Sequence, residues 1–383
     1  MPKPRRARWW SRLVALSLGL VLALALAELV LRSWNPLAGR ARYESYFEDS
    51  DRHRVDYAQA KARGLVVEPG LPRHRGTWAP GTVFYMCYRG GRRPYMDARG
   101  CARVDINSLG IRDRADLTWE KPPGTRRVVC IGDSFTFGWG VSAEVTWVRL
   151  VETILRGQSG LGDLHTVNCG AAGALYVDEY WWALRDRFGR LEPDVVLVSL
   201  CLNDVALMPN TVALESPDVV RRPHYPLRIL QIADAVYSFR HRFDLDPAID
   251  WGQLLLSIDP GDPFYAAKAE TPDMFWPSGG PQEALRAMRG WCQTHSAKFG
   301  VVVWPLFQNL AAGEHYPFRT LHRVVEDFCA AEAIPFLDLL PTFLGQRAED
   351  LWVDPSDLHG NEKAHALAAP ALATFVARLL GGT

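Results

Sequence analysis

The sequence lacks an excess of charge of either sign: 43 lysine and arginine residues balance 43 aspartate and glutamate residues among 383 residues. A chain without net charge has no general attraction for a strongly charged partner, so we expect no nucleic-acid partner. Internal repeats and low-complexity tracts are also missing, which argues against a solenoid or a disordered scaffold. With 48% apolar residues, the chain can bury the core of an enzyme-sized domain.

Cysteine is scarce, and none of the seven cysteines lies in a CxxC pair or in a Cys/His spacing typical of zinc. We therefore expect no metal site. Cys87 and Cys101 flank a turn-rich segment. They could form a disulfide in an oxidising compartment or remain free thiols, and the sequence leaves both alternatives open. The other five fall in or beside expected core strands and helices, where buried free thiols are usual: Cys130, Cys169, Cys201, Cys292 and Cys329.

Only the N-terminus carries a long hydrophobic run. Residues 13–27 are uncharged, apolar residues resume after Glu28, and the run approaches the ~20 residues that span a bilayer as a helix. Five basic residues precede it and no acidic one does, which predicts a cytoplasmic tail at 1–12, a transmembrane anchor at 13–34 and an extracytoplasmic remainder, periplasmic or on the cell surface. The alternative is a cleaved signal peptide, because residues 25–27 read Ala-Leu-Ala. Glu28 with Arg32 and Trp34 behind it favours the uncleaved anchor.

The rest of the chain divides by composition. Residues 35–121 are rich in proline, glycine and arginine, and the alternation at 82–86 predicts a small β-hairpin in an accessory segment. Residues 122–383 alternate apolar strands with amphipathic helices, which predicts a parallel sheet covered on both faces. Strands are expected at 127–131, 165–168, 194–200, 301–306 and 334–339. The stretch at about 205–280 is too long for a simple connection and is expected to be a functional insertion.

Three motifs follow the expected strands or precede the last helix. A short apolar strand ends in Gly132-Asp133-Ser134 and opens directly into a helix. A serine hydroxyl there lies near the positive end of the helix dipole, and it becomes a nucleophile when a base takes its proton. The alternative is a simple helix N-cap. Asn203 follows another apolar strand, and His359 precedes the helical run at 363–380.

Taken in this order, the motifs resemble those of the SGNH hydrolases in the GDSL esterase superfamily, including its membrane-anchored bacterial members. The resemblance covers residues 126–380 outside the insertion. It implies an α/β fold, a flavodoxin-like three-layer sandwich around a central parallel sheet of about five strands. It also implies a serine hydrolase that works through an acyl-enzyme.

The resemblance implies a role for each matching residue. Ser134 would be the nucleophile and His359 the base, while the Ser134 and Gly173 backbone N–H groups and the Asn203 amide would form the oxyanion hole. Gly170 is a weaker candidate donor than Gly173, and Gly173 could equally be a glycine that only a tight turn requires. Cys201 stands where relatives usually carry glycine.

The acid of the triad is the residue that departs from the family pattern. The usual Asp-x-x-His would place it at position 356, which is serine here. Asp357 and Asp354 are the candidates to orient the imidazole, and Asp357 is preferred because relatives with Asp-x-His are familiar. Asp204 is expected to order its own loop through hydrogen bonds, and His365 to pack inside the last helix.

The expected function is hydrolysis of an ester, acetyl or another short acyl group, on an acylated glycan or lipid of the cell envelope, with no cofactor. An O-acetyltransferase acting on an envelope polysaccharide and a non-catalytic envelope binding protein are the alternatives. Five aromatic residues of the insertion could line a sugar or acyl site or form a small local core: Trp251, Phe264, Tyr265, Phe275 and Trp276.

Overall fold

The computed structural model describes residues 6–33, 45–63, 66–67, 77–90, 92–157, 163–171, 176–209, 212, 225–233, 245, 249–268 and 273–381. The chain divides into two compact units. The small unit comprises Met1–Tyr43 and Ala213–Asp244, and the large unit comprises Glu44–Val212 and Leu245–Thr383.

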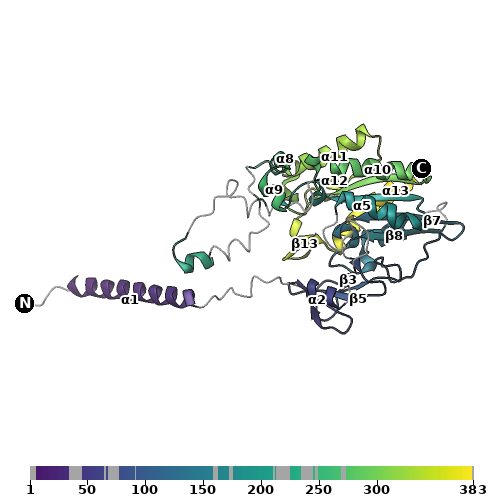
Figure 1. Ribbon diagram of the computed structural model, residues 1–383. Coiled ribbons are helices and arrows are strands. Elements are labelled where there is room, and N and C mark those ends of the chain that lie inside the picture. Colours follow the sequence, from purple (N-terminus) through teal and green to yellow (C-terminus); the bar gives the residue numbers. More distant parts are fainter. Residues whose placement is uncertain are drawn as a thin grey trace, which may run out of the picture. The chain divides into compact units, whose positions relative to one another are not determined.

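A five-stranded parallel sheet forms the centre of the large unit (Figure 1). Its strands are β7 (Thr125–Gly132), β8 (Asp163–Gly170), β9 (Val195–Cys201), β10 (Lys298–Trp304) and β11 (Phe336–Asp338). They lie in the order β11-β10-β9-β7-β8 with parallel pairing throughout. Every residue of β9 is buried, as expected for a strand covered on both faces. The expected α/β fold with five parallel strands is confirmed.

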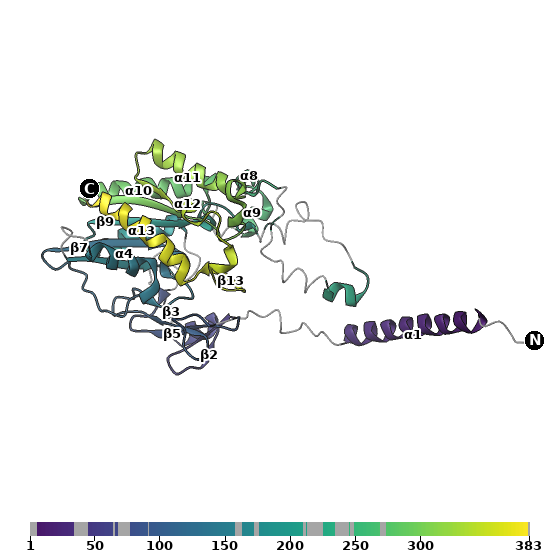
Figure 2. The same ribbon diagram turned by 180° about the vertical axis from the view of Figure 1, so that it is seen from behind.

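Helices cover both faces of this sheet. The helices α4 (Trp147–Arg156) and α13 (Glu362–Leu379) pack together on one face (Figure 2). The helices α5 (Val177–Asp186), α10 (Gly280–Thr294) and α11 (Arg319–Ala331) lie on the other (Figure 1). The pattern at 281–298 predicts a longer helix than the one observed. The chain leaves α10 after Thr294 because Ser296 adopts a left-handed backbone with φ 57°, and β10 then starts at Lys298.

The strand order places a topological switch point between β7 and β9. The connection from β7 leads to β8 on one side, and β9 leads to β10 on the other. In open parallel sheets, ligands bind beyond the carboxyl ends of the strands at such a point. The residues that follow β7 and β9 are those of the Gly-Asp-Ser turn and the Asn203 loop.

The accessory segment adds an antiparallel sheet to the same unit, in the order β2-β1-β5-β6. Its elements, with the small helix and ribbon beside them, are β1 (Ser45–Glu48), β2 (Arg54–Val55), α2 (Tyr57–Ala62), β3 (Val66–Val67), β4 (Thr77–Trp78), β5 (Val83–Tyr88) and β6 (Cys101–Asp105). The hairpin predicted around 82–86 is present as β5 and β6. Its apolar side chains share a buried cluster with Phe137 and Val141, which follow the Gly-Asp-Ser turn, and with Val353.

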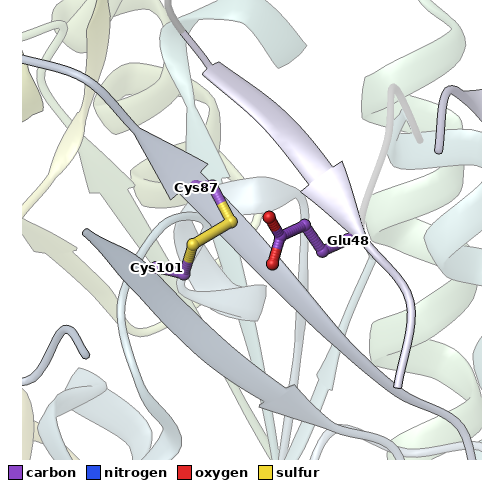
Figure 3. A group of neighbouring side chains, drawn as sticks. All are labelled: Glu48, Cys87 and Cys101. Carbon is purple, nitrogen blue, oxygen red and sulfur yellow. A yellow bond between two sulfur atoms is a disulfide. The ribbon is translucent and has the colours of Figure 1, made fainter. Parts of the chain in front are cut away.

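A disulfide joins Cys87 of β5 to Cys101 of β6, so of the two alternatives the sequence left open, the disulfide is the one observed. The other five cysteines are buried free thiols, as expected. The carboxylate of Glu48 lies close to this disulfide, an arrangement that resembles a ligand cluster (Figure 3). Sulfur atoms in a disulfide are not thiolate ligands, however.

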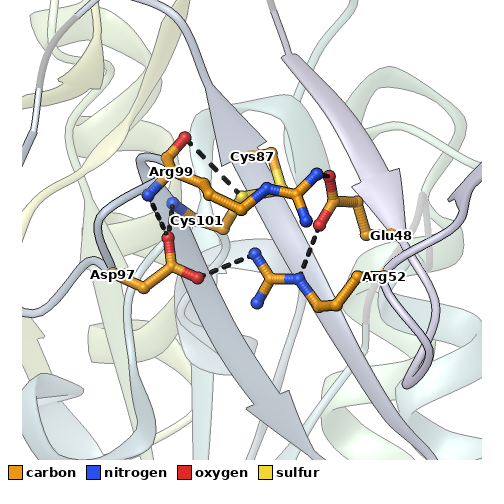
Figure 4. Close-up of a disulfide and its surroundings, with 6 residues drawn as sticks. All are labelled: Glu48, Arg52, Cys87, Asp97, Arg99 and Cys101. Atoms are coloured by element: carbon orange, nitrogen blue, oxygen red, sulfur yellow. Dashed lines mark hydrogen bonds and ion pairs between the residues drawn. A yellow bond between two sulfur atoms is a disulfide. The ribbon is translucent and has the colours of Figure 1, made fainter.

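Ion pairs account for the burial of Glu48 (Figure 4). The Arg52 Nε and Arg99 Nη2 atoms lie 2.7 and 2.5 Å from its two carboxylate oxygens, and the Glu48 residue is only 1% exposed. Arg52 also reaches Asp97 at 2.7 Å, and Asp97 accepts the Cys101 N–H at 3.0 Å. Because a buried carboxylate is stable only when paired, this network fixes the turn between β5 and β6 around the disulfide.

The insertion contributes α8 (Trp251–Ser257) and α9 (Pro263–Lys268) to the large unit. Four of its five aromatic residues are almost completely buried: Trp251, Tyr265, Phe275 and Trp276. Phe264 is half-buried. The rings contact neighbours in the core, with Tyr265 and Tyr176 both packed edge-on against Phe275. These residues form a local core, the second of the two expected alternatives.

The small unit contains the apolar helix α1 (Arg6–Ser33). Residues Trp9–Ser33 are long and apolar enough to cross a membrane, and none of that span is buried. Glu28 interrupts the apolar surface near its end. Its carboxylate accepts the N–H groups of Arg228 and Ile229 at 2.7 and 3.1 Å and pairs with Arg32 at 2.8 Å. The charge is therefore compensated within the unit.

Candidate active site at the switch point of the parallel sheet

The Gly-Asp-Ser turn lies where β7 ends and the short helix α3 (Ser134–Phe137) begins. Asp133 caps this helix, because its side chain accepts the Phe135 N–H at 2.9 Å. Glycine is required at the preceding position: a Cβ on Gly132 would lie 2.3 Å from Thr136 Oγ1 and 2.4 Å from the Ser199 carbonyl oxygen. The turn therefore presents the Ser134 side chain at the first residue of a helix, and the N-cap of that helix is Asp133.

His359 lies on a small hairpin formed by β12 (Trp352–Asp354) and β13 (Asp357–Gly360). The sequence pattern predicts that His359 lies on a loop entering the last helix. The structure corrects this detail, because His359 lies in a short strand that pairs with β12. Two hydrogen bonds leave the imidazole in opposite directions. The distance from His359 Nε2 to Ser134 Oγ is 2.8 Å, and that from His359 Nδ1 to Asp357 Oδ1 is 2.5 Å. Ser134, His359 and Asp357 thus form one hydrogen-bonded chain.

Asp354, the other candidate acid, binds elsewhere. Its Oδ1 accepts the backbone N–H and the hydroxyl of Ser356 at 2.9 and 2.6 Å, and its Oδ2 accepts the Gly90 N–H at 2.8 Å. These bonds close the turn between β12 and β13. Asp354 therefore shapes the hairpin, while Asp357 contacts the imidazole.

Opposite charges set the protonation of the pair. Burial lowers the pKa of His359, but the charge and hydrogen bond of Asp357 outweigh it and hold that pKa above the ordinary histidine value. Burial raises the pKa of Asp357, and the attraction and hydrogen bonds of His359 outweigh it in turn, so this pKa lies below the ordinary value. The Asp357 side chain is 12% exposed and that of His359 28%. The acid is thus shielded while the imidazole remains accessible.

Asn203 lies beside the serine, in a single 3-10 turn (Leu202–Asp204) after β9. Its Nδ2 atom lies 3.3 Å from Asp133 Oδ2, which is itself 3.5 Å from Ser134 Oγ. Through these two contacts, Asp133 links the serine hydroxyl to the Asn203 amide. Burial raises the pKa of the Asp133 carboxyl.

Cysteine at position 201 is compatible with this turn. Cys201 has φ −104° and ψ 161°, extended backbone that any residue adopts, so a glycine is not needed there. Asp204 accepts the Cys201 N–H at 2.9 Å and the Tyr180 hydroxyl at 2.9 Å. It orders the loop, as expected.

Of the two glycines expected after β8, Gly170 is described and Gly173 lies outside the described residues. A Cβ on Gly170 would lie 2.1 Å from the Phe137 backbone nitrogen. Glycine at 170 therefore allows β8 to pack directly against the helix that carries Ser134.

The sequence profile of the GDSL-like lipase/acylhydrolase family matches residues 130–367. This range contains the Gly-Asp-Ser turn, Asn203 and His359. The chain belongs to this family. Its members hydrolyse esters, so the chain is an ester hydrolase of the SGNH type.

Solved structures similar to this hydrolase include three esterases. The lipase/acylhydrolase from Enterococcus faecalis is 16% identical, with 66% of this chain and 94% of that chain covered and a TM-score of 0.36. The esterase EstA from Pseudoalteromonas sp. is 14% identical (67% and 100% covered, TM-score 0.38). The acetyl-xylooligosaccharide esterase Axe2 from Geobacillus is 14% identical (67% and 95% covered, TM-score 0.40). The search of curated proteins found no match.

Two residues that support the hydrolase site carry no signal in the local sequence. Tyr88 donates its hydroxyl hydrogen bond to Asp357 Oδ2 at 2.8 Å from an accessory strand. Arg112, only 3% exposed, donates to the carbonyl oxygens of Phe137, Gly138 and Val141, and burial lowers its pKa to about 9. Both contacts join segments far apart in the sequence, so no local pattern predicts them.

His365 differs from His359 in its burial and in the direction of its pKa shift. It is 2% exposed, and its Nδ1 lies 3.1 Å from the backbone nitrogen of Trp147. Burial lowers its pKa to about 3. It is a packing residue of the last helix, as expected.

The imidazole of His359 should titrate above the ordinary histidine value in the full-length protein in detergent. Because Asp357 stabilises the imidazolium, Asp357→Asn should lower this pKa, and Asp354→Asn should leave it unchanged. Carbon-13 NMR of labelled histidine rings, with the signal assigned by a His359→Gln variant, measures the shift. Equal shifts in the two asparagine variants would contradict the pairing.

Proposed function

We propose that this hydrolase is a serine esterase whose nucleophile is Ser134, whose base is His359 and whose orienting acid is Asp357. The observation that carries the proposal is the continuous chain of hydrogen bonds from Ser134 Oγ through His359 to Asp357 Oδ1, at 2.8 and 2.5 Å. A serine hydroxyl attacks a carbonyl only when a base removes its proton, and the base keeps the correct tautomer when a carboxylate holds its other nitrogen.

The reaction then follows in two steps. His359 takes the proton of Ser134 as its Oγ bonds to the ester carbon, and the imidazolium returns the proton to the leaving alcohol. Water, deprotonated by the same imidazole, then bonds to the acyl carbon; the bond to Ser134 Oγ breaks, the imidazolium returns the proton to Oγ, and the acid is released. The developing oxyanion would be held by the Ser134 and Gly173 backbone N–H groups and the Asn203 amide. The proposed steps need only these protein groups and water.

Asn203 has a hydrogen-bonding partner before substrate arrives. Its Nδ2 lies 3.3 Å from Asp133 Oδ2, while its Oδ1 is buried without a partner among the described residues. We infer that Asp133 keeps the amide N–H side turned toward the nucleophile. This role explains an aspartate at that position beyond its capping of α3.

The proposed substrate is an acetyl or other short acyl ester on a glycan or lipid of the cell envelope. Two observations support an envelope location: the exposed apolar helix α1 near the N-terminus and the disulfide between Cys87 and Cys101. Disulfides persist in oxidising compartments outside the cytoplasm. A signal peptide would give the same compartment with a free, mature protein.

Removal of the nucleophile tests the esterase proposal. Ser134→Ala should reduce hydrolysis of 4-nitrophenyl acetate by about 10³-fold or more, because the acyl-enzyme cannot form. Circular dichroism checks that the variant is folded. An alanine variant that keeps a tenth of the activity would contradict the assignment.

An acceptor glycan separates the alternatives of hydrolysis and transfer. The wild-type protein should release acetate from 4-nitrophenyl acetate at the same rate with and without an acetyl-free polysaccharide, as measured by chromatography. Appearance of acetylated polysaccharide in place of free acetate would instead indicate an O-acetyltransferase. No turnover in either assay, by a folded protein, would favour the binding protein.

The proposed topology, with residues 1–12 cytoplasmic, an anchor at 13–34 and the rest outside, is tested by fusions. A fluorescent protein that matures only in the cytoplasm should be dark after Thr383 and bright before Met1. A bright C-terminal fusion would contradict the envelope location. Expression of the full-length chain that yields a soluble protein with a new N-terminus near Glu28 would show a cleaved signal peptide.

A further inference from the structure

The last residue of β5 reaches the acid of the proposed triad. The Tyr88 hydroxyl donates to Asp357 Oδ2 at 2.8 Å, and the residue is 4% exposed. The other oxygen of the same carboxylate, Oδ1, lies 2.5 Å from His359 Nδ1 and accepts the His359 backbone N–H at 3.1 Å. Both oxygens of Asp357 are therefore occupied, one by the base and one by the accessory sheet.

We propose that Tyr88 is a positioning residue of the esterase, acting through Asp357, and that the accessory sheet is thereby a functional part of the active site. This proposal rests on the triad assigned above. A carboxylate free to rotate about its Cβ–Cγ bond could offer His359 either oxygen at varied angles. A donor fixed on Oδ2 holds the carboxylate plane and reserves Oδ1 for the imidazole.

The tyrosine ring is itself held rigidly. Its backbone N–H donates to the Gly100 carbonyl oxygen at 3.0 Å, and the preceding residue is joined by the disulfide to Cys101. The hydroxyl also lies against the loop that follows α3, since a Cβ on Gly140 would be 2.6 Å from it. Tyr88 thus fits between that loop and β13, which carry or flank the serine and histidine.

The accessory segment holds the histidine hairpin at a second place. The Gly90 N–H donates to Asp354 Oδ2 at 2.8 Å, and a Cβ at Gly90 would lie 2.4 Å from that oxygen. Arg93 donates to the carbonyl oxygens of Val353, at 3.2 Å, and of Trp352, at 2.5 Å. Hydrogen bonds from Gly90 and Arg93 to β12, together with the one from Tyr88 to β13, therefore join the accessory segment to the histidine hairpin.

Burial and the neighbouring Asp357 carboxylate raise the pKa of Tyr88 well above its usual value, so the hydroxyl keeps its proton and remains a donor. With Oδ2 held by this donor, Oδ1 stays directed at His359, where it stabilises the imidazolium. Other ionisable groups that act on Tyr88 or His359 include Asp133, Asp354, Tyr95 and His365; the last two carry no charge near neutral pH, because burial raises the pKa of Tyr95 and lowers that of His365. None of them is altered by the substitution that tests the proposal.

Tyr88→Phe removes only the hydroxyl. In the full-length protein in detergent, we expect kcat for 4-nitrophenyl acetate to fall about tenfold with KM changed less than about twofold, because substrate does not contact Tyr88. The acidic limb of the kcat/KM profile should move to lower pH, since an Asp357 carboxylate that is no longer held stabilises the imidazolium less. A purely structural role would lower the amount of folded protein and leave the position of this limb unchanged.

Tyr95→Phe is the matched control. Tyr95 lies in the same accessory segment, its hydroxyl is buried, and that oxygen has no hydrogen-bond partner among the described residues. Its substitution should leave kcat and the pH profile as in the wild-type protein. Similar losses in both phenylalanine variants would overturn the proposal, because they would point to general damage of the accessory segment.

A double-mutant cycle shows whether Tyr88 acts through the acid. Tyr88→Phe should cost about tenfold in the wild-type background and less than about twofold when Asp357 is already asparagine. Equal losses in both backgrounds, or a Tyr88→Phe variant with wild-type kcat and pH profile, would refute the positioning role. Failure of the triad itself would be recognised separately, by a Ser134→Ala variant that retains activity.

Discussion

The hydrogen bond between His359 and Asp357 is the interaction on which the proposed chemistry depends. It raises the pKa of the imidazole above its ordinary value and turns the other ring nitrogen, Nε2, toward Ser134. The parallel sheet brings Ser134 and Asn203 together because β7 and β9 are neighbours at the switch point. The hairpin before α13 then adds the histidine and the acid.

The accessory sheet is joined to this centre by packing as well as by hydrogen bonds. Its Phe84 and Met86 side chains share one buried cluster with Phe137, Val141 and Val353, which flank the serine helix or lie in the histidine hairpin. Exposure of that apolar surface would be costly, and so would an unpaired Asp357 carboxylate oxygen in a buried setting. Fold stability and the geometry of the site therefore depend on the same contacts.

Local patterns predicted the parts of the structure that local forces determine. Apolar runs gave the five strands, and the strand-turn-helix sequence around Ser134 gave the serine at a helix start. The end of α10 was missed because Ser296 adopts a left-handed backbone that glycine usually adopts. The contact of Tyr88 with Asp357, 269 positions apart, depends on tertiary packing and has no local signature. The hairpin strand that carries His359 likewise depends on pairing between β12 and β13.

The central claim is that Ser134 is an activated nucleophile, and covalent labelling tests it most directly. Ser134 Oγ should attack the phosphorus of an alkyl fluorophosphonate and displace fluoride, and peptide mass spectrometry should place a single phosphonyl group on the peptide containing residues 132–138. Denatured protein should not react, and Asp357→Asn should react much more slowly, because the imidazole then lacks its orienting acid. Labelling of a different serine, or full esterase activity after complete labelling of Ser134, would contradict the account.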